Sequence, residues 1–98
     1  MTLSAIAGLL MLLLTLDQKI EIGLRMCDEL SGNFDYDGCV VQVSADESVM
    51  WLHALCFVWD PVRERGHYDE QAIVKYAWDG DRLRVTESPY LFGCPEYS

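Results

Sequence analysis

Apolar residues recur at steps of three and four positions along the first thirty residues. Such spacing places side chains on one side of an α-helix, so the pattern predicts one long helix over residues 1–31. Thr2 or Ser4 can cap its start, and Gly32 suits a left-handed stop. Asp17 alone interrupts the stripe, whose apolar members are Leu3, Ile6, Leu10, Leu13, Ile20, Leu24 and Cys27.

The first half of this helix is apolar on every side. Residues 3–16 carry no charge, whereas polar residues begin at Asp17. A helix of fourteen residues spans only about 21 Å, which is short of a membrane core, so a buried helix or an oligomer seam is favoured. Leu9, Leu12 and Leu16 lie off the stripe and need a second copy, a partner or lipid to cover them.

Short β-rich runs separated by turn residues fill the rest of the chain, residues 33–98. Asp79-Gly80-Asp81 between two such runs is a strong hairpin signal. A polar loop is expected over residues 62–69. The chain is therefore predicted to be one α+β domain, residues 1–98, with one long N-terminal helix packed on a small antiparallel meander. The strands are expected at residues 39–43, 49–59, 72–78 and 82–87.

Acidic residues outnumber basic ones, sixteen to seven, for a formal net charge of −9. That charge repels phosphate, which argues against direct binding to nucleic acid or to an anionic membrane, and it favours a basic partner. No Lys or Arg occurs between Arg25 and Arg63, and this gap is either a solvated face or a docking surface. A smaller basic group near Tyr76 and Trp78 contacts an acidic partner or offsets local acids; it comprises Arg63, Arg65, Arg82 and Arg84.

Four cysteines are present and none forms a CxxC pair. An even count permits two disulfides in three connectivities. Their density is below that of a disulfide scaffold, and Cys27 and Cys56 lie in apolar runs, where a free thiol behaves as a small hydrophobe. We therefore expect reduced thiols at Cys27, Cys39, Cys56 and Cys94, and a cytoplasmic protein.

Two patterns suggest metal sites only weakly. Residues 33–38 carry oxygen side chains at alternate positions and a glycine, as in the first half of a calcium loop, but Ser44 stands where that loop needs a bidentate Glu. His53 and Cys56 are spaced for zinc on a helix, yet they diverge on a strand. Nucleophilic catalysis would need Cys56 or a serine beside a histidine and an orienting acid, and the sequence does not bring His67 near any cysteine. Neither a metal, a cofactor nor enzymatic activity is expected.

These features favour a small acidic partner-binding protein of inhibitor or adaptor type. Phage-encoded inhibitors of this kind occupy the basic, nucleic-acid-binding surface of a larger protein by placing carboxylates where phosphates would sit. The expected partner-binding residues combine acids with aromatic anchors: Phe34, Asp35, Tyr36, Asp37, Asp46 and Glu47. Assembly of a homo-oligomer through the apolar helix is an alternative that the sequence leaves open.

The opening Met1-Thr2-Leu3 and the helix plan, apolar and then amphipathic before a sheet, resemble pilin-like proteins. Ala5 departs from that family, which usually has Glu at this position. The resemblance covers about a third of the chain. It implies an alternative function as a structural subunit, anchored by residues 1–16 in a membrane or a pilin-like filament.

Overall fold

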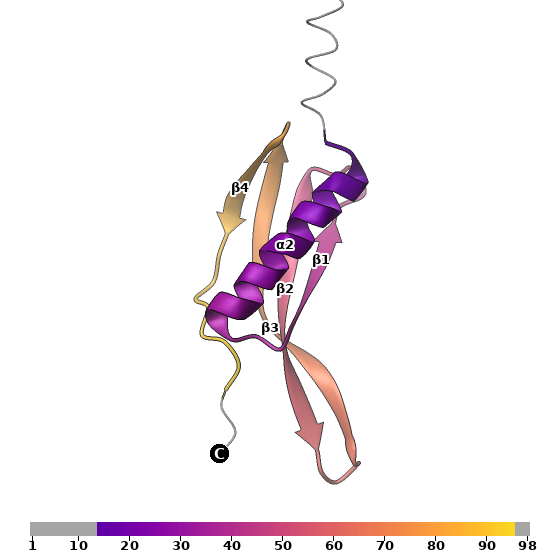
Figure 1. Ribbon diagram of the computed structural model, residues 1–98, viewed down its shortest axis with the longest axis vertical. Coiled ribbons are helices and arrows are strands. Elements are labelled where there is room, and N and C mark those ends of the chain that lie inside the picture. The colour runs from indigo at the N-terminus through magenta and orange to yellow at the C-terminus, as the bar shows by residue number, and fades with distance from the viewer. Residues whose placement is uncertain (1–13, 96–98) are drawn as a thin grey trace, which may run out of the picture.

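One helix packs on one face of a four-stranded antiparallel sheet in the computed structural model, which describes residues 14–95 (Figure 1). The strands follow one another in the order β1-β2-β3-β4, so the sheet is a simple meander. The predicted α+β architecture is confirmed. The elements are α2 (Leu16–Phe34), β1 (Gly38–Val43), β2 (Val49–Asp60), β3 (Arg65–Asp79) and β4 (Arg82–Glu87).

Helix α2 has a defined start at Thr15. The Thr15 hydroxyl accepts a hydrogen bond from the backbone of Gln18, and the Gln18 side chain accepts one from the backbone of Thr15, which is a capping box. A single helix running through Thr15 is therefore wrong, because this residue has an extended backbone. The caps proposed at Thr2 and Ser4 lie outside the described residues.

The C-terminus of α2 also differs from the prediction. The helix runs through Gly32 to Phe34, and the left-handed residue is Asp35, with φ of 57°. The N–H of Asp35 donates to the carbonyl of Ser31, which satisfies one of the last helical acceptors. A short polar side chain such as Asp tolerates this conformation, so no glycine is required.

Three strands lie within one residue of their predicted limits, but β3 does not. The loop expected over residues 62–69 is wrong, since β3 begins at Arg65 and only residues 61–64 form the turn. Tyr68 lies in this polar segment and pairs with Phe57 on β2. Cross-strand pairing therefore makes the segment a strand in spite of its polar composition. The β2–β3 hairpin thus projects beyond α2 as a two-stranded ribbon, residues 57–68, called the arm below (Figure 1).

The core lies between α2 and the sheet. Alternate residues of β2 face the helix and are almost completely buried, as expected for a strand with one covered face. Helix α2 lies close to the sheet at Gly23, because a Cβ there would lie 2.6 Å from Val41 Cγ1 and 2.9 Å from Met50 Sδ. The buried hydrophobic residues are Cys27, Leu30, Tyr36, Met50, Leu52, Ala54, Cys56, Ala72 and Val74.

Two disulfides join these elements. Cys27 on α2 is bonded to Cys39 on β1, and Cys56 on β2 is bonded to Cys94 in the C-terminal tail, with Cα–Cα distances of 5.4 and 5.5 Å. The expectation of reduced thiols is therefore wrong. Apolar surroundings are equally suited to a thiol and to a disulfide, and only the packing of α2 and the tail on the sheet brings the partners within bonding range.

Candidate functional site

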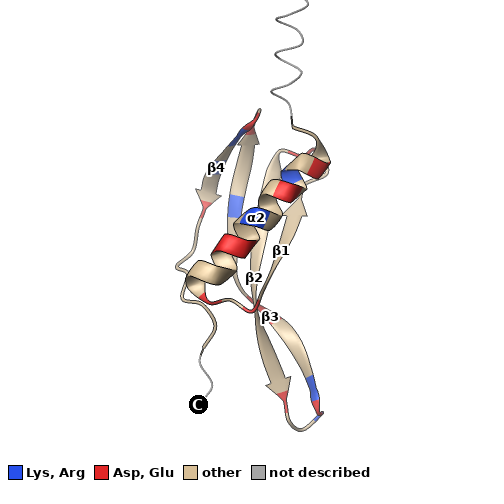
Figure 2. Cartoon of the chain, in the orientation of Figure 1, with Lys and Arg blue, Asp and Glu red and all other residues tan. Residues whose placement is uncertain are grey.

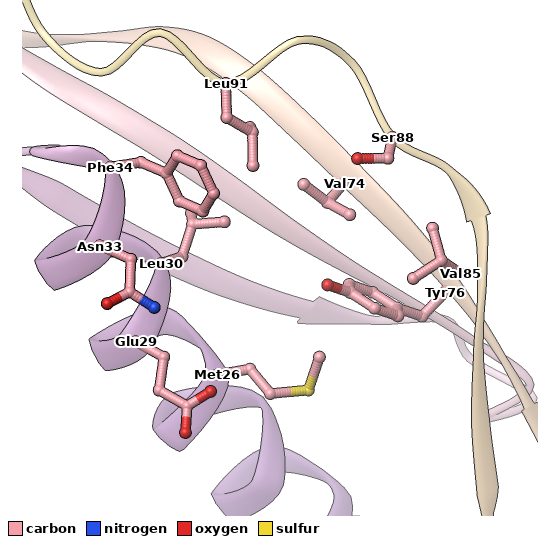
Figure 3. A pocket seen from close by; sticks show the side chains of 10 residues that line it. All are labelled: Met26, Glu29, Leu30, Asn33, Phe34, Val74, Tyr76, Val85, Ser88 and Leu91. Carbon is pink, nitrogen blue, oxygen red and sulfur yellow. The ribbon is translucent and has the colours of Figure 1, made fainter.

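A groove of about 200 Å³ separates the C-terminal half of α2 from β3, β4 and the tail (Figure 3). Helix residues form one wall, strand residues form the floor, and Leu91 of the tail faces Phe34 across one end. The lining is mostly apolar, with a few polar groups around it. It comprises Met26, Glu29, Leu30, Asn33, Phe34, Val74, Tyr76, Val85, Ser88 and Leu91.

The groove contains one ionisable group with a shifted pKa. Burial raises the pKa of the Tyr76 hydroxyl, which therefore stays protonated at neutral pH. Neither a histidine nor a thiol is among the ten lining residues, whose polar side chains are those of Glu29, Asn33, Tyr76 and Ser88. Its volume is also below the roughly 300–1,000 Å³ of typical small-molecule sites.

The four acids predicted to bind a basic partner lie in two separate places. Asp35 and Asp37 precede β1, whereas Asp46 and Glu47 lie in the turn that follows it. Six residues of strand, about 20 Å, separate the two pairs. Figure 2 shows acidic positions at both ends of β1. The acids therefore do not form one continuous surface, and binding to a basic partner stays a prediction.

The aromatic anchors and the acids beside them have structural roles. Tyr36 is only 7% exposed and belongs to the core, so its proposed role as a surface anchor is wrong. Phe34 is partly exposed and lines the groove. Asp37 Oδ2 accepts a hydrogen bond of 2.7 Å from the backbone N–H of Phe57, and the carbonyl of Asp35 accepts one from Cys94.

The second acidic pair organises the β1–β2 turn. Asp46 Oδ1 accepts hydrogen bonds from the hydroxyls of Ser44 and Ser48 and from the Ser48 backbone, and these lower the pKa of Asp46 to about 2. The carbonyl of Glu47 accepts a 3.0 Å bond from Lys19 Nζ. Lys19 also lies over the Trp78 ring, 5.6 Å from its centroid, and so links α2 to this end of the sheet.

The metal sites considered from the sequence are not assembled. Within residues 14–95, one group of potential ligands, Asp37, Cys56 and Cys94, has atoms within 4.8 Å of one another. Its two sulfurs are bonded to each other and cannot act as thiolates. The same bond excludes a zinc site at His53 and Cys56. Asn33 belongs to the last turn of α2, so residues 33–38 do not form a calcium loop.

The arginines do not gather around the β3–β4 aromatic residues. Trp78 pairs with Leu83 and Tyr76 pairs with Val85, on the side of the sheet that faces α2. Arg82 and Arg84 therefore point to the opposite side, because side chains alternate along a strand. Arg63 and Arg65 lie at the end of the arm. The predicted basic cluster with Tyr76 and Trp78 is wrong.

The prediction also missed the sheet face that points away from α2. His53 lies on this face, where Nδ1 contacts Glu70 and Nε2 lies 2.7 Å from Gln42 Oε1. Trp51, Phe57 and Trp59 share the same parity on β2 as His53. Alternation of aromatic residues at odd positions of β2 was the available signal, and it was obscured because both faces of this strand are apolar.

Leu16 is the one predicted anchor residue within the described chain; it lies in the first turn of α2 and is exposed, while Leu9 and Leu12 fall outside. No helix within residues 14–95 is long and apolar enough to cross a membrane. Comparison of the chain with protein-family models, curated proteins and solved structures found no match.

Proposed function

We propose that this chain is a structural subunit of an extracytoplasmic assembly, held by its apolar N-terminal segment in a membrane or a pilin-like filament. The observation that carries the proposal is a domain stapled by two disulfides that begins at Thr15, at the end of the uncharged run of residues 3–16. Disulfides persist in oxidising compartments and are rare in the cytosol.

The position of the core supports a role for the described domain that is separate from that of the N-terminal segment. All buried hydrophobic residues of the described part lie between Cys27 and Val74. The tail is then tied back to β2 by Cys94 and by the backbone hydrogen bond from Cys94 to Asp35. A domain stabilised in this way leaves the apolar run at its N-terminal end available for attachment.

The capped start of α2 changes the comparison with pilin-like proteins in one respect. That resemblance implies one helix that passes from the apolar to the amphipathic half without interruption. Here Thr15 has an extended backbone and α2 begins afresh at Leu16. The proposed attachment therefore does not require a helix that continues through Thr15.

Membrane fractionation of the full chain and of a variant lacking residues 1–13 tests this proposal. The chain is expressed with a C-terminal alkaline phosphatase, an enzyme that is active only after export. We expect phosphatase activity, full-length protein in the membrane or filament fraction, and release of the shortened variant to the soluble fraction with its disulfides intact. Soluble, monodisperse full-length protein with four reactive thiols in the cell would overturn the proposal.

A further inference from the structure

The sheet face opposite α2 carries a line of apolar side chains that no other described element covers. These residues alternate along β2 and continue onto their partners on β3. Trp59 is 55% exposed and Tyr68 is 57% exposed, which is high for side chains of this size. We call this surface the aromatic strip; it comprises Leu55, Phe57, Trp59, Tyr68 and Ile73.

Two rings of the strip, those of Phe57 and Tyr68, lie over glycines whose missing side chains leave room for them. A Cβ at Gly66 would overlap the Phe57 ring, and a Cβ at Gly38 would lie 3.6 Å from the Tyr68 ring. The Phe57 and Tyr68 rings also meet edge to face, with centroids 5.5 Å apart. Aromatic rings that cover strand glycines lose little freedom on binding, so the strip is preorganised as a contact surface.

The arm carries part of the strip and has little stability of its own. Residues 57–68 form a two-stranded ribbon beyond the helix (Figure 1), and such a ribbon is marginally stable without a second layer. Layered folds bury the apolar face of a sheet against another element. Among residues 14–95 one layer, α2, covers the opposite face only, so the strip has no cover within the described part of the chain.

The charge on this face favours a second copy of the same chain. Its charged residues are balanced, although the whole chain carries −9. Two copies therefore repel each other less here than across other surfaces. The register places three basic and three acidic side chains on this face: Lys75, Arg82, Arg84, Glu70, Asp79 and Glu87.

The polar centre of the face is compatible with burial. Both ring nitrogens of His53 are engaged, one by Glu70 and the other by Gln42. A polar group that already has its hydrogen-bond partners costs far less to remove from water than an unpaired one. An incoming apolar surface therefore leaves no ring nitrogen of His53 without a partner.

The size of the face also fits a dimer. Twelve residues of β2 extend for about 40 Å, and the neighbouring strands give a width of about 15 Å, so the face covers roughly 600 Å² before side-chain relief. Stable interfaces bury about 800 Å² per partner. We propose that two copies of this chain dock through the aromatic strip, sheet against sheet, in a symmetric dimer. This dimer does not depend on the proposed function.

Sedimentation equilibrium of the full, oxidised chain in mild non-ionic detergent tests the dimer. Ile73→Lys and Trp59→Glu place a charge on the strip, while Val62→Lys and Val85→Lys are matched controls at exposed positions off it. We expect the two strip variants to raise the dimer Kd by more than about tenfold and the controls to change it less than about twofold. Circular dichroism verifies that each variant is folded.

A photocrosslinker at residue 59 gives a second, independent measurement. Benzophenone at this position should yield covalent dimers in which the linked peptide comes from β2 or β3 of the other copy. A chain that stays monomeric at about 100 µM, links at residues 1–13 instead, or loses dimerisation equally in all four variants would overturn the inference. Membrane attachment is scored separately by fractionation, so failure of one proposal is distinguishable from failure of the other.

Discussion

Cys94, in the C-terminal tail, is bonded to Cys56, the last residue of β2 before the arm. The bond closes a loop with a sequence separation of 38 residues, and the N–H of Cys94 also donates to the carbonyl of Asp35. The tail therefore holds together the end of α2, the middle of β2 and one end of the groove. The Cys27–Cys39 bond does the same for α2 and β1 over a separation of 12.

Removal of these bonds should cost more stability for the bond that closes the longer loop. Chain entropy predicts a loss of roughly 4 kcal/mol for Cys56→Ser with Cys94→Ser, and roughly 3 kcal/mol for Cys27→Ser with Cys39→Ser. Urea unfolding of both double variants, beside the oxidised and reduced parent, measures the difference. An unfolding free energy that is indifferent to reductant contradicts the prediction.

Gly23 and Gly32 provide a matched pair on α2. A Cβ at Gly23 would lie 2.6 Å from Val41 Cγ1, whereas nothing lies within 4 Å of a Cβ at Gly32. Gly32→Ala should stabilise the helix by about 0.5–1 kcal/mol. Gly23→Ala should destabilise the protein by about 1–2 kcal/mol, because overpacking outweighs the same gain. Thermal unfolding compares them, and equal effects would show that α2 does not approach β1 closely.

Acid should loosen the β1–β2 turn through Asp46. Hydrogen bonds from Ser44 and Ser48 lower its pKa from 3.8 to about 2, so the folded state favours the carboxylate. The stability that Asp46 contributes is therefore present above about pH 4 and is lost as the pH falls through about 2. Carboxyl NMR titration should locate this pKa. Asp46→Asn should remove the transition, and a midpoint near 4 would exclude the hydrogen-bonded turn.

Gly66 should be required for order in the arm. Its Cβ position is occupied by the Phe57 ring, so Gly66→Ala should displace the ring and lower the protection of residues 57–68 against hydrogen exchange. Phe57→Leu combined with Gly66→Ala should recover part of that protection, because the smaller side chain leaves space. Additive effects of the two changes would mean that the residues are not in contact.

Local patterns in the sequence were sufficient for the architecture. Apolar residues at helical spacing from Ile20 to Cys27, β-rich runs between turn residues, and the Asp79-Gly80 step correctly predicted a helix and an antiparallel meander. β-rich runs between turn residues predicted the limits of β1, β2 and β4 to within one residue. These features depend on neighbours along the chain, which a single sequence displays directly.

The structure does not bring the residues of the predicted site together, because the prediction grouped them by their position in the sequence. Asp37 and Asp46 are nine positions apart, but β1 separates them, so they lie at opposite ends of that strand. Tyr36 looked like an anchor among acids and instead fills the core. Arg84 shares a strand with Leu83, yet the hairpin register sends it away from Trp78.

What the sequence determined by itself was the set of elements and their order, because hydrogen bonding and side-chain alternation within helices and hairpins are short-range. Tertiary structure alone decided that Cys27 meets Cys39, that Cys94 meets Cys56, and that Phe57 and Tyr68 stand together on an uncovered face. Each of these depends on how α2, β1, the tail and the arm pack in space. Such contacts between distant residues form when elements bury their apolar surfaces against one another. Each of these surfaces is built from several segments of the chain, so no one segment predicts the contact.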